Sequence, residues 1–378
     1  MRSLRIAIAS AGRFHALDLA RELHRLGHSP RFYSYVPKRR AERFGLAGEC
    51  HVSLFAAAAP MLAWSRLAPR LAPGPRQRAM NAALNRAVIA RLQPCDVIIG
   101  MSGIFLEALE YAKSRFGARV WLERGSRHIL SQDEILAALP GAERPSRYVI
   151  ERELAGYALA DRIVIPSEHV AQSFAGDREL RAKLFRNPYG VDLAMFPIQP
   201  SRPANGEFRL LTVGGWSRRK GGDLLVEAVR SMNGVRLQHV GELVDLAFPT
   251  DDARFVHLPA LPQDQLARIY HQADAFVLAS REEGLSLVLP QALASGLPVI
   301  CSDRTGGADL GHTPALKDRI VVARHDDAQD LAAAIAGARQ RLTVGPPLAP
   351  LGETDLQALS WSAYGRRYRD ELLRDLGA

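Results

Sequence analysis

Short apolar runs alternate with longer stretches of helical periodicity in the first half of the chain. The run at 4–9 ends before Gly12, and apolar residues then recur at helical spacing until Gly27. Further apolar strands are predicted at 30–35, 97–100, 120–122 and 162–165, with helices at 105–115 and 147–159. Alternation of this kind predicts a mostly parallel sheet covered by helices.

The second half of the chain shows the same alternation. Strands are predicted at 209–213, 235–240, 255–258, 275–278 and 298–301, with helices at 223–231, 263–271 and 287–295. Between the halves, 197–206 is rich in Pro, Gly and Ser without periodicity, as a linker would be. We therefore expect an α/β protein with one parallel-sheet domain at 1–196 and another at 206–358, followed by a final helix within 359–378.

Length and composition agree with two soluble domains. A chain of 378 residues is longer than a domain with a single hydrophobic core usually is. A composition of 47% hydrophobic and 24% charged residues is typical of a globular protein. No uncharged apolar run reaches the ~18 residues that a membrane-spanning helix needs. The N-terminus is basic and then apolar like a signal peptide, but Gly12 and Arg13 interrupt it too early. We expect a first strand and a cytoplasmic protein.

The positive charge is concentrated in the first domain. Residues 1–100 hold 16 Lys and Arg against 5 Asp and Glu, whereas the whole chain carries +9. A surplus of this kind favours anionic partners such as phospholipid headgroups, a lipid diphosphate or a phosphorylated glycan. Nucleic acid is not expected as a partner, because none of its binding signatures is present and aromatic residues are only 7%.

The segment 50–65 is apolar and contains no Asp, Glu, Lys or Arg, and basic residues follow it at Arg66, Arg70, Arg76, Arg78 and Arg86. Apolar and aromatic residues next to basic ones are what a peripheral contact with an anionic membrane requires. The alternative is a buried strand at 51–55 followed by a loop in the core. In both cases an ordinary amphipathic helix is expected at 80–92.

The most informative motif is Glu283 with Gly284, at a predicted strand end, before an apolar run that leads into the segment 294–300. A glycine that permits close approach, followed by a helix start, offers free N–H groups and a positive dipole end to a phosphate. The N–H groups of Leu287 and Val288 would face the phosphates, and the carboxylate beside them can bind sugar hydroxyls. The motif therefore predicts a sugar-nucleotide site.

A second motif is the turn at 213–215, where Gly214 and Gly215 end a predicted strand and the basic loop of Arg218, Arg219 and Lys220 follows. A nucleoside diphosphate that gains charge as its sugar leaves is stabilised by cations and backbone donors. An exposed basic turn without a function is the alternative.

These motifs, together with 187–192 (Asn-Pro-Tyr-Gly-Val-Asp) and 165–168 (Ile-Pro-Ser-Glu), resemble those of the retaining glycosyltransferases of family 4 type, "glycosyl transferases group 1". The resemblance covers most of the chain and keeps the order of the motifs. It implies the GT-B fold, two Rossmann-like domains that face a cleft, with the nucleotide sugar on the second domain and the acceptor on the first. It also implies that the final helix packs back onto the first domain.

The resemblance assigns roles to four positions of the second domain. Lys220 would bind the diphosphate and Glu283 the donor sugar. The family often has arginine where this chain has Gly215, so we expect Arg219 or Arg218 to supply that charge. The family's second glutamate, which accepts from ribose hydroxyls, is Gln291 here, and a neutral amide makes weaker hydrogen bonds than a carboxylate.

In the first domain, Gly12 and Arg13 lie where the family brings backbone N–H groups close to the diphosphate. His128 follows the strand at 120–122, and related enzymes have a histidine there that reaches the donor sugar or the acceptor. A structural histidine is the alternative. Glu282 is expected to be a solvated neighbour of Glu283.

We expect no metal and no cofactor besides the donor substrate, since the Asp-x-Asp pattern of metal-dependent transferases is absent and Cys50, Cys95 and Cys301 are far apart in apolar stretches. We thus expect a metal-independent glycosyltransferase acting on a glycan or lipid-linked acceptor, and the resemblance alone implies that it is retaining. The habit of the family, together with the basic first domain, implies a role in bacterial surface polysaccharide or lipopolysaccharide assembly. Two alternatives remain: a GT-B sugar-nucleotide epimerase, and a non-catalytic partner subunit in which Gly215 and Gln291 replace charged residues.

Overall fold

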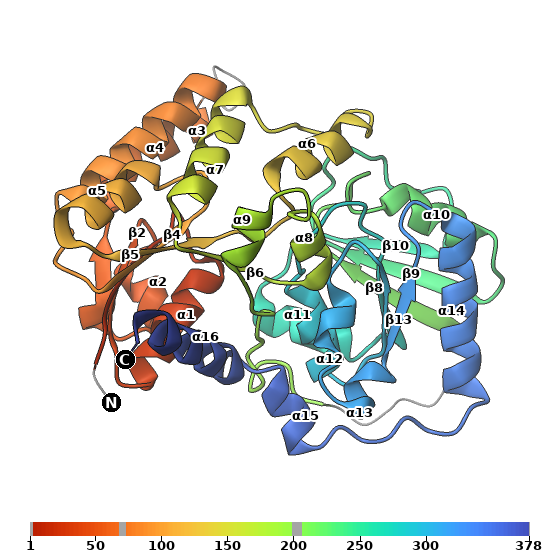
Figure 1. The fold of residues 1–378 in the computed structure, drawn as a ribbon. Coiled ribbons are helices and arrows are strands. Elements are labelled where there is room, and N and C mark those ends of the chain that lie inside the picture. Colours follow the sequence, from red (N-terminus) through yellow and green to blue (C-terminus); the bar gives the residue numbers. More distant parts are fainter. Residues whose placement is uncertain (1–2, 68–72, 199–205, 378) are drawn as a thin grey trace.

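Two parallel sheets organise the molecule, as the computed structural model shows for residues 3–67, 73–198 and 206–377 (Figure 1). Within these residues the first sheet has seven strands in the order β3-β2-β1-β4-β5-β6-β7, and the second has six in the order β10-β9-β8-β11-β12-β13. All pairs of neighbouring strands are parallel. The predicted class, two Rossmann-like α/β domains, is confirmed.

The strands of the first sheet are β1 (Arg5–Ala9), β2 (Ser29–Ser34), β3 (His51–Ser53), β4 (Val97–Met101), β5 (Arg119–Glu123), β6 (Arg162–Ile165) and β7 (Leu184–Arg186). Those of the second are β8 (Phe208–Val213), β9 (Val235–Val240), β10 (Phe255–Leu258), β11 (Ala275–Leu278), β12 (Val299–Ser302) and β13 (Ile320–Ala323). The central strands are continuous apolar runs because helices cover both faces, and Val97, Ile98 and Ile99 of β4 are all fully buried.

The helices of the first domain are α1 (Phe14–Arg25), α2 (Lys38–Arg43), α3 (Phe55–Leu67), α4 (Pro73–Ile89), α5 (Leu106–Phe116), α6 (Ile129–Ala137), α7 (Arg147–Leu159), α8 (Glu168–Gln172) and α9 (Arg178–Ala182). The remaining helices are α10 (Gly222–Arg230), α11 (Gln263–Tyr270), α12 (Val288–Ala294), α13 (Pro314–Lys317), α14 (Ala328–Thr343), α15 (Glu353–Ala358) and α16 (Trp361–Leu376). Local signals place several ends: Ser146 caps α7, and Gly117 ends α5 in the left-handed region.

The strand order reverses direction beside β1 in the first sheet and beside β8 in the second. Loops at the carboxyl ends of the strands on either side of such a switch point diverge and leave room for a ligand. The loops after β1, β4, β8 and β11 are therefore the ones that the fold places at a site.

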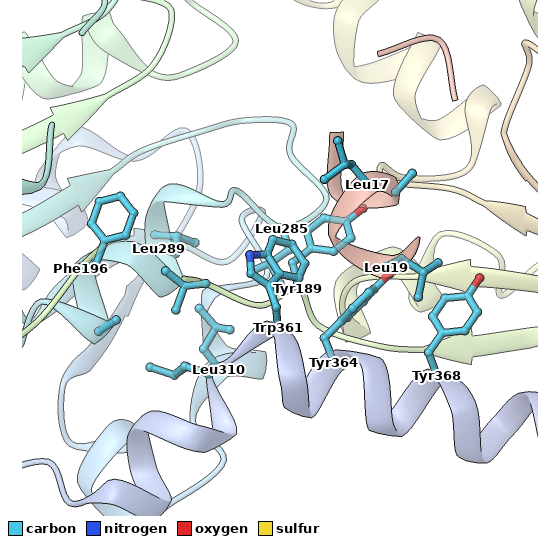
Figure 2. Packing of buried hydrophobic residues seen from close by; sticks show 14 of the residues in the cluster. Leu17, Leu19, Tyr189, Phe196, Leu285, Leu289, Leu310, Trp361, Tyr364 and Tyr368 are labelled. Carbon is cyan, nitrogen blue, oxygen red and sulfur yellow. The ribbon is translucent and has the colours of Figure 1, made fainter. Parts of the chain in front are cut away.

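One hydrophobic cluster continues from the first domain into the second through α16. Figure 2 shows Trp361, Tyr364 and Tyr368 projecting from α16, with Leu17 and Leu19 of α1 nearby in the same cluster. Tyr368 also donates a hydrogen bond of 2.7 Å to Glu123 at the end of β5. The last helix is therefore held against the first domain by apolar packing and by a buried hydrogen bond.

The core-loop alternative for 51–65 is wrong. The strand there ends at Ser53, and the apolar segment forms α3, whose Phe55 remains about half exposed. Consecutive alanines favour a helix over a strand or loop. The helix expected at 80–92 begins earlier, at Pro73. Arg70 and most of the linker at 197–206 lie outside the described residues.

Cys50, Cys95 and Cys301 are buried free thiols, as expected, and burial raises the pKa of each to about 11. Among the described helices, none is long and apolar enough to cross a membrane.

Candidate functional site

Lys220 and Glu283 form an ion pair at the centre of the site. Lys220 lies in the loop between β8 and α10, and Glu283 in the loop after β11, so two neighbouring strands bring together residues 63 positions apart. Both side chains are only 17% exposed. Burial, together with the positive charge of Arg219, lowers the pKa of Lys220 to about 7, whereas Glu282 acts in the opposite direction.

Glu282 is buried, at 1% exposure, and the expectation of a solvated side chain is wrong. Its carboxylate accepts hydrogen bonds from Arg219, at 3.2 Å, and from the hydroxyl of Ser126. Arg219 belongs to the second domain and Ser126 to the loop after β5 in the first. Glu282 therefore links the two domains beside the Lys220–Glu283 pair.

Gly284 lies where the two domains touch. A Cβ atom added there would be 1.8 Å from the carbonyl oxygen of Gly125, so a side chain at this position would force the loops apart. Ser167, from the loop after β6, donates a hydrogen bond of 2.8 Å to the Gly284 carbonyl. The glycine thus serves a close contact between backbones, in addition to any role toward a phosphate.

His169, which the sequence analysis did not select, contacts the same loop. Its Nε2 lies 2.6 Å from the carbonyl oxygen of Glu283, so this nitrogen is the donor. Burial and the neighbouring Arg127 lower the pKa of His169 to about 4. The signal available in the sequence was the position of His169 just after the 165–168 motif.

His128 lies in a different environment. Its Nδ1 accepts a hydrogen bond from the backbone of Leu130 and caps α6, and its ring packs against Tyr157 and Phe174. Burial lowers its pKa. Within the described residues, it makes no hydrogen bond or ion pair with the Lys220–Glu283 pair.

The turn after β8 is tightly packed. Gly214 has φ 133° and its carbonyl accepts a hydrogen bond of 2.7 Å from His239. A side chain on Gly215 would meet Val244, whose nearest methyl lies 2.9 Å from the added Cβ. Arg218 is turned toward Asp223, at 3.6 Å, so of the two arginines it is Arg219 that lies beside the glutamates.

The loop after β1 faces the second domain. Arg13 donates a hydrogen bond of 3.3 Å to Gln263 of α11 across the domain boundary. The hydroxyl of Ser10 donates a hydrogen bond of 2.8 Å to the carbonyl of Gly12. Phe14 adopts φ 36° although it is not glycine, and it is 55% exposed. Left-handed backbone at a bulky residue is a strained conformation of the kind found at ligand sites.

A cavity of about 210 Å³ separates this loop from α12. Gln291 and Leu287 line it together with Arg13, Phe14 and Gln263. Gln291 is 8% exposed, and its Oε1 lies 3.1 Å from the hydroxyl of Tyr270. The backbone N–H groups of Leu287 and Val288 have no acceptor in the described part of the chain, in agreement with a helix start that is open to a ligand.

The structure thus brings Lys220, Glu283 and Arg219 together, places Gln291, Arg13 and Leu287 around a neighbouring cavity, and leaves His128 and Arg218 in other contacts. Sequence reasoning missed Ser126, His169, Phe14 and Gln263, and misjudged Glu282. Within the described residues there is no cluster of three or more His, Cys, Asp or Glu arranged to hold a metal.

Comparison with known sequences points to one family. Residues 207–340 match the family model described as "Glycosyl transferases group 1". D-inositol 3-phosphate glycosyltransferase of Segniliparus rotundus is 31% identical over 176 residues, which is 40% of this chain and 38% of that protein. Glycogen synthase of Mycobacterium tuberculosis is 30% identical over 131 residues, 31% of each chain. The alignments therefore span well under half of these relatives.

Comparison with solved structures supports the fold over the whole chain. Sucrose-phosphate synthase from Thermosynechococcus elongatus superposes with a TM-score of 0.71 at 18% identity, covering 99% of both chains. HepE of Anabaena, solved in complex with UDP and glucose, has a TM-score of 0.65 at 13% identity, covering 98% of this chain and 99% of that one. The GT-B architecture predicted from the sequence is confirmed.

Proposed function

We propose that the protein is a retaining glycosyltransferase, because residues 207–340 match the model of the glycosyl transferases group 1 family and the chain has the GT-B fold. It moves a sugar from a nucleoside-diphosphate sugar, bound on the second domain, to a glycan or lipid-linked acceptor held by the first. The observation that carries this proposal is the partly buried pair of Lys220 and Glu283 next to Arg219.

The pair suggests how donor binding proceeds. A diphosphate beside α12 attracts the Lys220 ammonium more strongly than one carboxylate does, because it carries more charge and more acceptor oxygens. Once Lys220 turns to the phosphates, Glu283 is free to accept hydrogen bonds from sugar hydroxyls. Binding thus exchanges an internal ion pair for two contacts with the donor, one on each side of the bond that breaks.

The departing diphosphate gains negative charge as the glycosidic bond breaks. Lys220 and Arg219 stabilise this charge in a site that the first domain partly shields from water. A phosphate oxygen of the donor takes the proton of the acceptor hydroxyl, and the acceptor attacks from the face that the diphosphate leaves. No metal has a part in this scheme, since the two cations supply the positive charge.

The surface of the first domain is suited to an enzyme that acts at the inner face of a membrane. Phe55 of α3 is 49% exposed, and the helix α2 carries the exposed Arg40 and Arg43. Apolar and basic residues together favour peripheral contact with anionic lipid. On this basis we place the enzyme in bacterial surface polysaccharide or lipopolysaccharide assembly.

A thermal-shift panel tests the donor assignment. The ligands are UDP, GDP, ADP, CMP and dTDP with their sugar conjugates, with magnesium and with EDTA, since a ligand of the folded state raises its stability. A shift in EDTA by one diphosphate supports the proposal and identifies the donor class. If that donor is converted to a free epimerised sugar, the protein is an epimerase, and if no nucleotide shifts a well-folded sample, it is a non-catalytic partner.

A further inference from the structure

A large cavity lined by arginines lies beside the donor site. Its volume is about 990 Å³, within the range of small-molecule sites. The first domain contributes α1, α2 and the residues after α2, and the second contributes the start of α11. Arg13 and Gln263 line both this cavity and the smaller one that reaches Gln291, so the two spaces adjoin.

Two of the lining arginines are already neutralised by the protein. Arg21 is buried and donates to Asp18, at 2.6 Å, and to Glu22, at 2.8 Å. Arg25 donates to the same Glu22 carboxylate, at 3.0 Å. The charges of Arg21 and Arg25 are therefore compensated by Asp18 and Glu22 at the wall of the cavity.

Arg40 and Arg43 have no such partner. Both are exposed on α2, three positions apart and so on one face of the helix, and no carboxylate or carbonyl in the described residues is hydrogen-bonded to either guanidinium. The acid of the same helix, Glu42, points elsewhere, because its Oε1 would lie 2.7 Å from a Cβ on Gly48. Two charges therefore face the cavity unpaired.

Arg13 stands between these arginines and the donor site. Its guanidinium carbon lies 3.5 Å from the centre of the Phe44 ring, which fixes the plane of the group. Burial lowers the pKa of Arg13, Asp18 at 3.6 Å acts in the opposite direction, and the charges of Arg21 and Arg40 lower the pKa further, so these guanidinium groups repel one another. A bound anion would relieve this repulsion.

The other side of the cavity is suited to hydroxyl groups. Asp264, in the first turn of α11, is exposed and has no ion-pair partner in the described residues, and Gln263 precedes it. Asp192 also lines the cavity, but its carboxylate accepts from the backbone N–H groups of Ala194 and Met195, at 3.1 and 3.3 Å. The cavity thus offers guanidinium groups from the first domain and acceptors for hydroxyl groups from the second.

We propose that the acceptor is a phosphate-bearing carbohydrate whose phosphate is bound by Arg40 and Arg43 and whose hydroxyls face Asp264 and Gln263. Guanidinium groups bind phosphate through paired, charge-assisted hydrogen bonds. The phosphate belongs either to a free sugar phosphate or to a lipid headgroup. This inference rests on the proposed function, because it takes the neighbouring cavity as part of the donor site.

Calorimetry with glucose 6-phosphate, and with glucose as the phosphate-free control, tests the soluble form. The proteins are the wild type, the double variant Arg40→Gln/Arg43→Gln, the variant Lys220→Met, which disables the predicted donor site, and Arg39→Gln, which removes an exposed arginine of α2 outside the cavity. We expect glucose 6-phosphate to bind the double variant about tenfold or more weakly than the other three. Glucose alone should not distinguish them.

Flotation with phosphatidylglycerol and phosphatidylcholine vesicles tests the lipid-borne form. Binding to phosphatidylglycerol that is lost in Arg40→Gln/Arg43→Gln and kept in Arg39→Gln supports a headgroup phosphate. The proposal is overturned if the double variant equals the wild type with both probes, or if glucose 6-phosphate binding is lost in Lys220→Met alone. The nucleotide thermal shift of the double variant should match that of the wild type, so a failure here leaves the proposed function standing.

Discussion

The hydroxyl of Ser126 donates a hydrogen bond to the carboxylate of Glu282, and this contact joins two domains across 156 positions of sequence. Glu282 precedes Glu283, so the contact fixes the loop that holds the ion pair with Lys220. The geometry of the site therefore depends on how the domains meet as well as on the second domain itself.

Replacing Ser126 with Ala leaves the buried Glu282 with one partner fewer. We expect the contact between the two domains to be about 1–3 kcal/mol less stable. We also expect a higher KM for the donor, because the loop that holds Glu283 becomes freer to move. Donor kinetics and the thermal midpoint measure both effects. Ser114→Ala is the matched control, since Ser114 is exposed on α5 and its hydroxyl donates to the carbonyl of Tyr111 in the same helix. Equal kinetics for the two variants would contradict the role of this contact.

The two histidines of the first domain can be separated by paired variants. His169→Asn removes the donor to the Glu283 carbonyl, and we expect kcat to fall about tenfold, as for one lost hydrogen bond. His128→Asn keeps a good helix cap at α6, so we expect kcat to change less. The opposite order would favour the direct role for His128 that the family resemblance implies.

Gln291→Glu tests the ribose contact. Tyr270 can still donate to the new carboxylate, and a charged acceptor makes stronger hydrogen bonds to ribose hydroxyls, so we expect donor affinity to rise several-fold. Gln272→Glu on the surface controls for the added charge. An unchanged dissociation constant would show that position 291 does not touch the donor.

The lowered pKa of Lys220 predicts that donor binding takes up a proton. Near and above pH 7 a fraction of the free protein carries neutral Lys220, whereas the diphosphate requires the ammonium and raises its pKa. Affinity should therefore fall as pH rises through about 7 to 9. Calorimetric titrations in buffers of different ionisation enthalpy measure the proton directly, and a binding enthalpy independent of buffer at pH 8 would rule this coupling out.

Local patterns in the sequence were sufficient for most of the fold. The strands at 235–240, 255–258 and 275–278 and the helix at 147–159 were predicted with the bounds that the structure shows, because each is a strongly periodic or continuous apolar segment between turn signals. Helix α3 was missed, since an alanine-rich apolar segment without charges lacks the polar face that marks an amphipathic helix.

The site was predictable only where it depends on local motifs. Glu283 was found because it lies at a strand end next to glycine, and Lys220 because the motif around it resembles that of the family. The burial of Glu282 and the contact of His169 arise from the other domain, and the left-handed backbone of Phe14 carries no residue signature. Contacts between domains therefore had to come from the structure.

The most direct test of the account is a calorimetric titration, in EDTA, of wild type and Lys220→Met with the diphosphate that the panel identifies. Lys317→Met, at an exposed lysine of α13, is the control for the substitution. We predict that the wild type and the control bind without metal and that Lys220→Met binds about 100-fold more weakly or not at all. Equal affinity in Lys220→Met, or binding by the wild type only when magnesium is added, would contradict a metal-independent donor site built on Lys220.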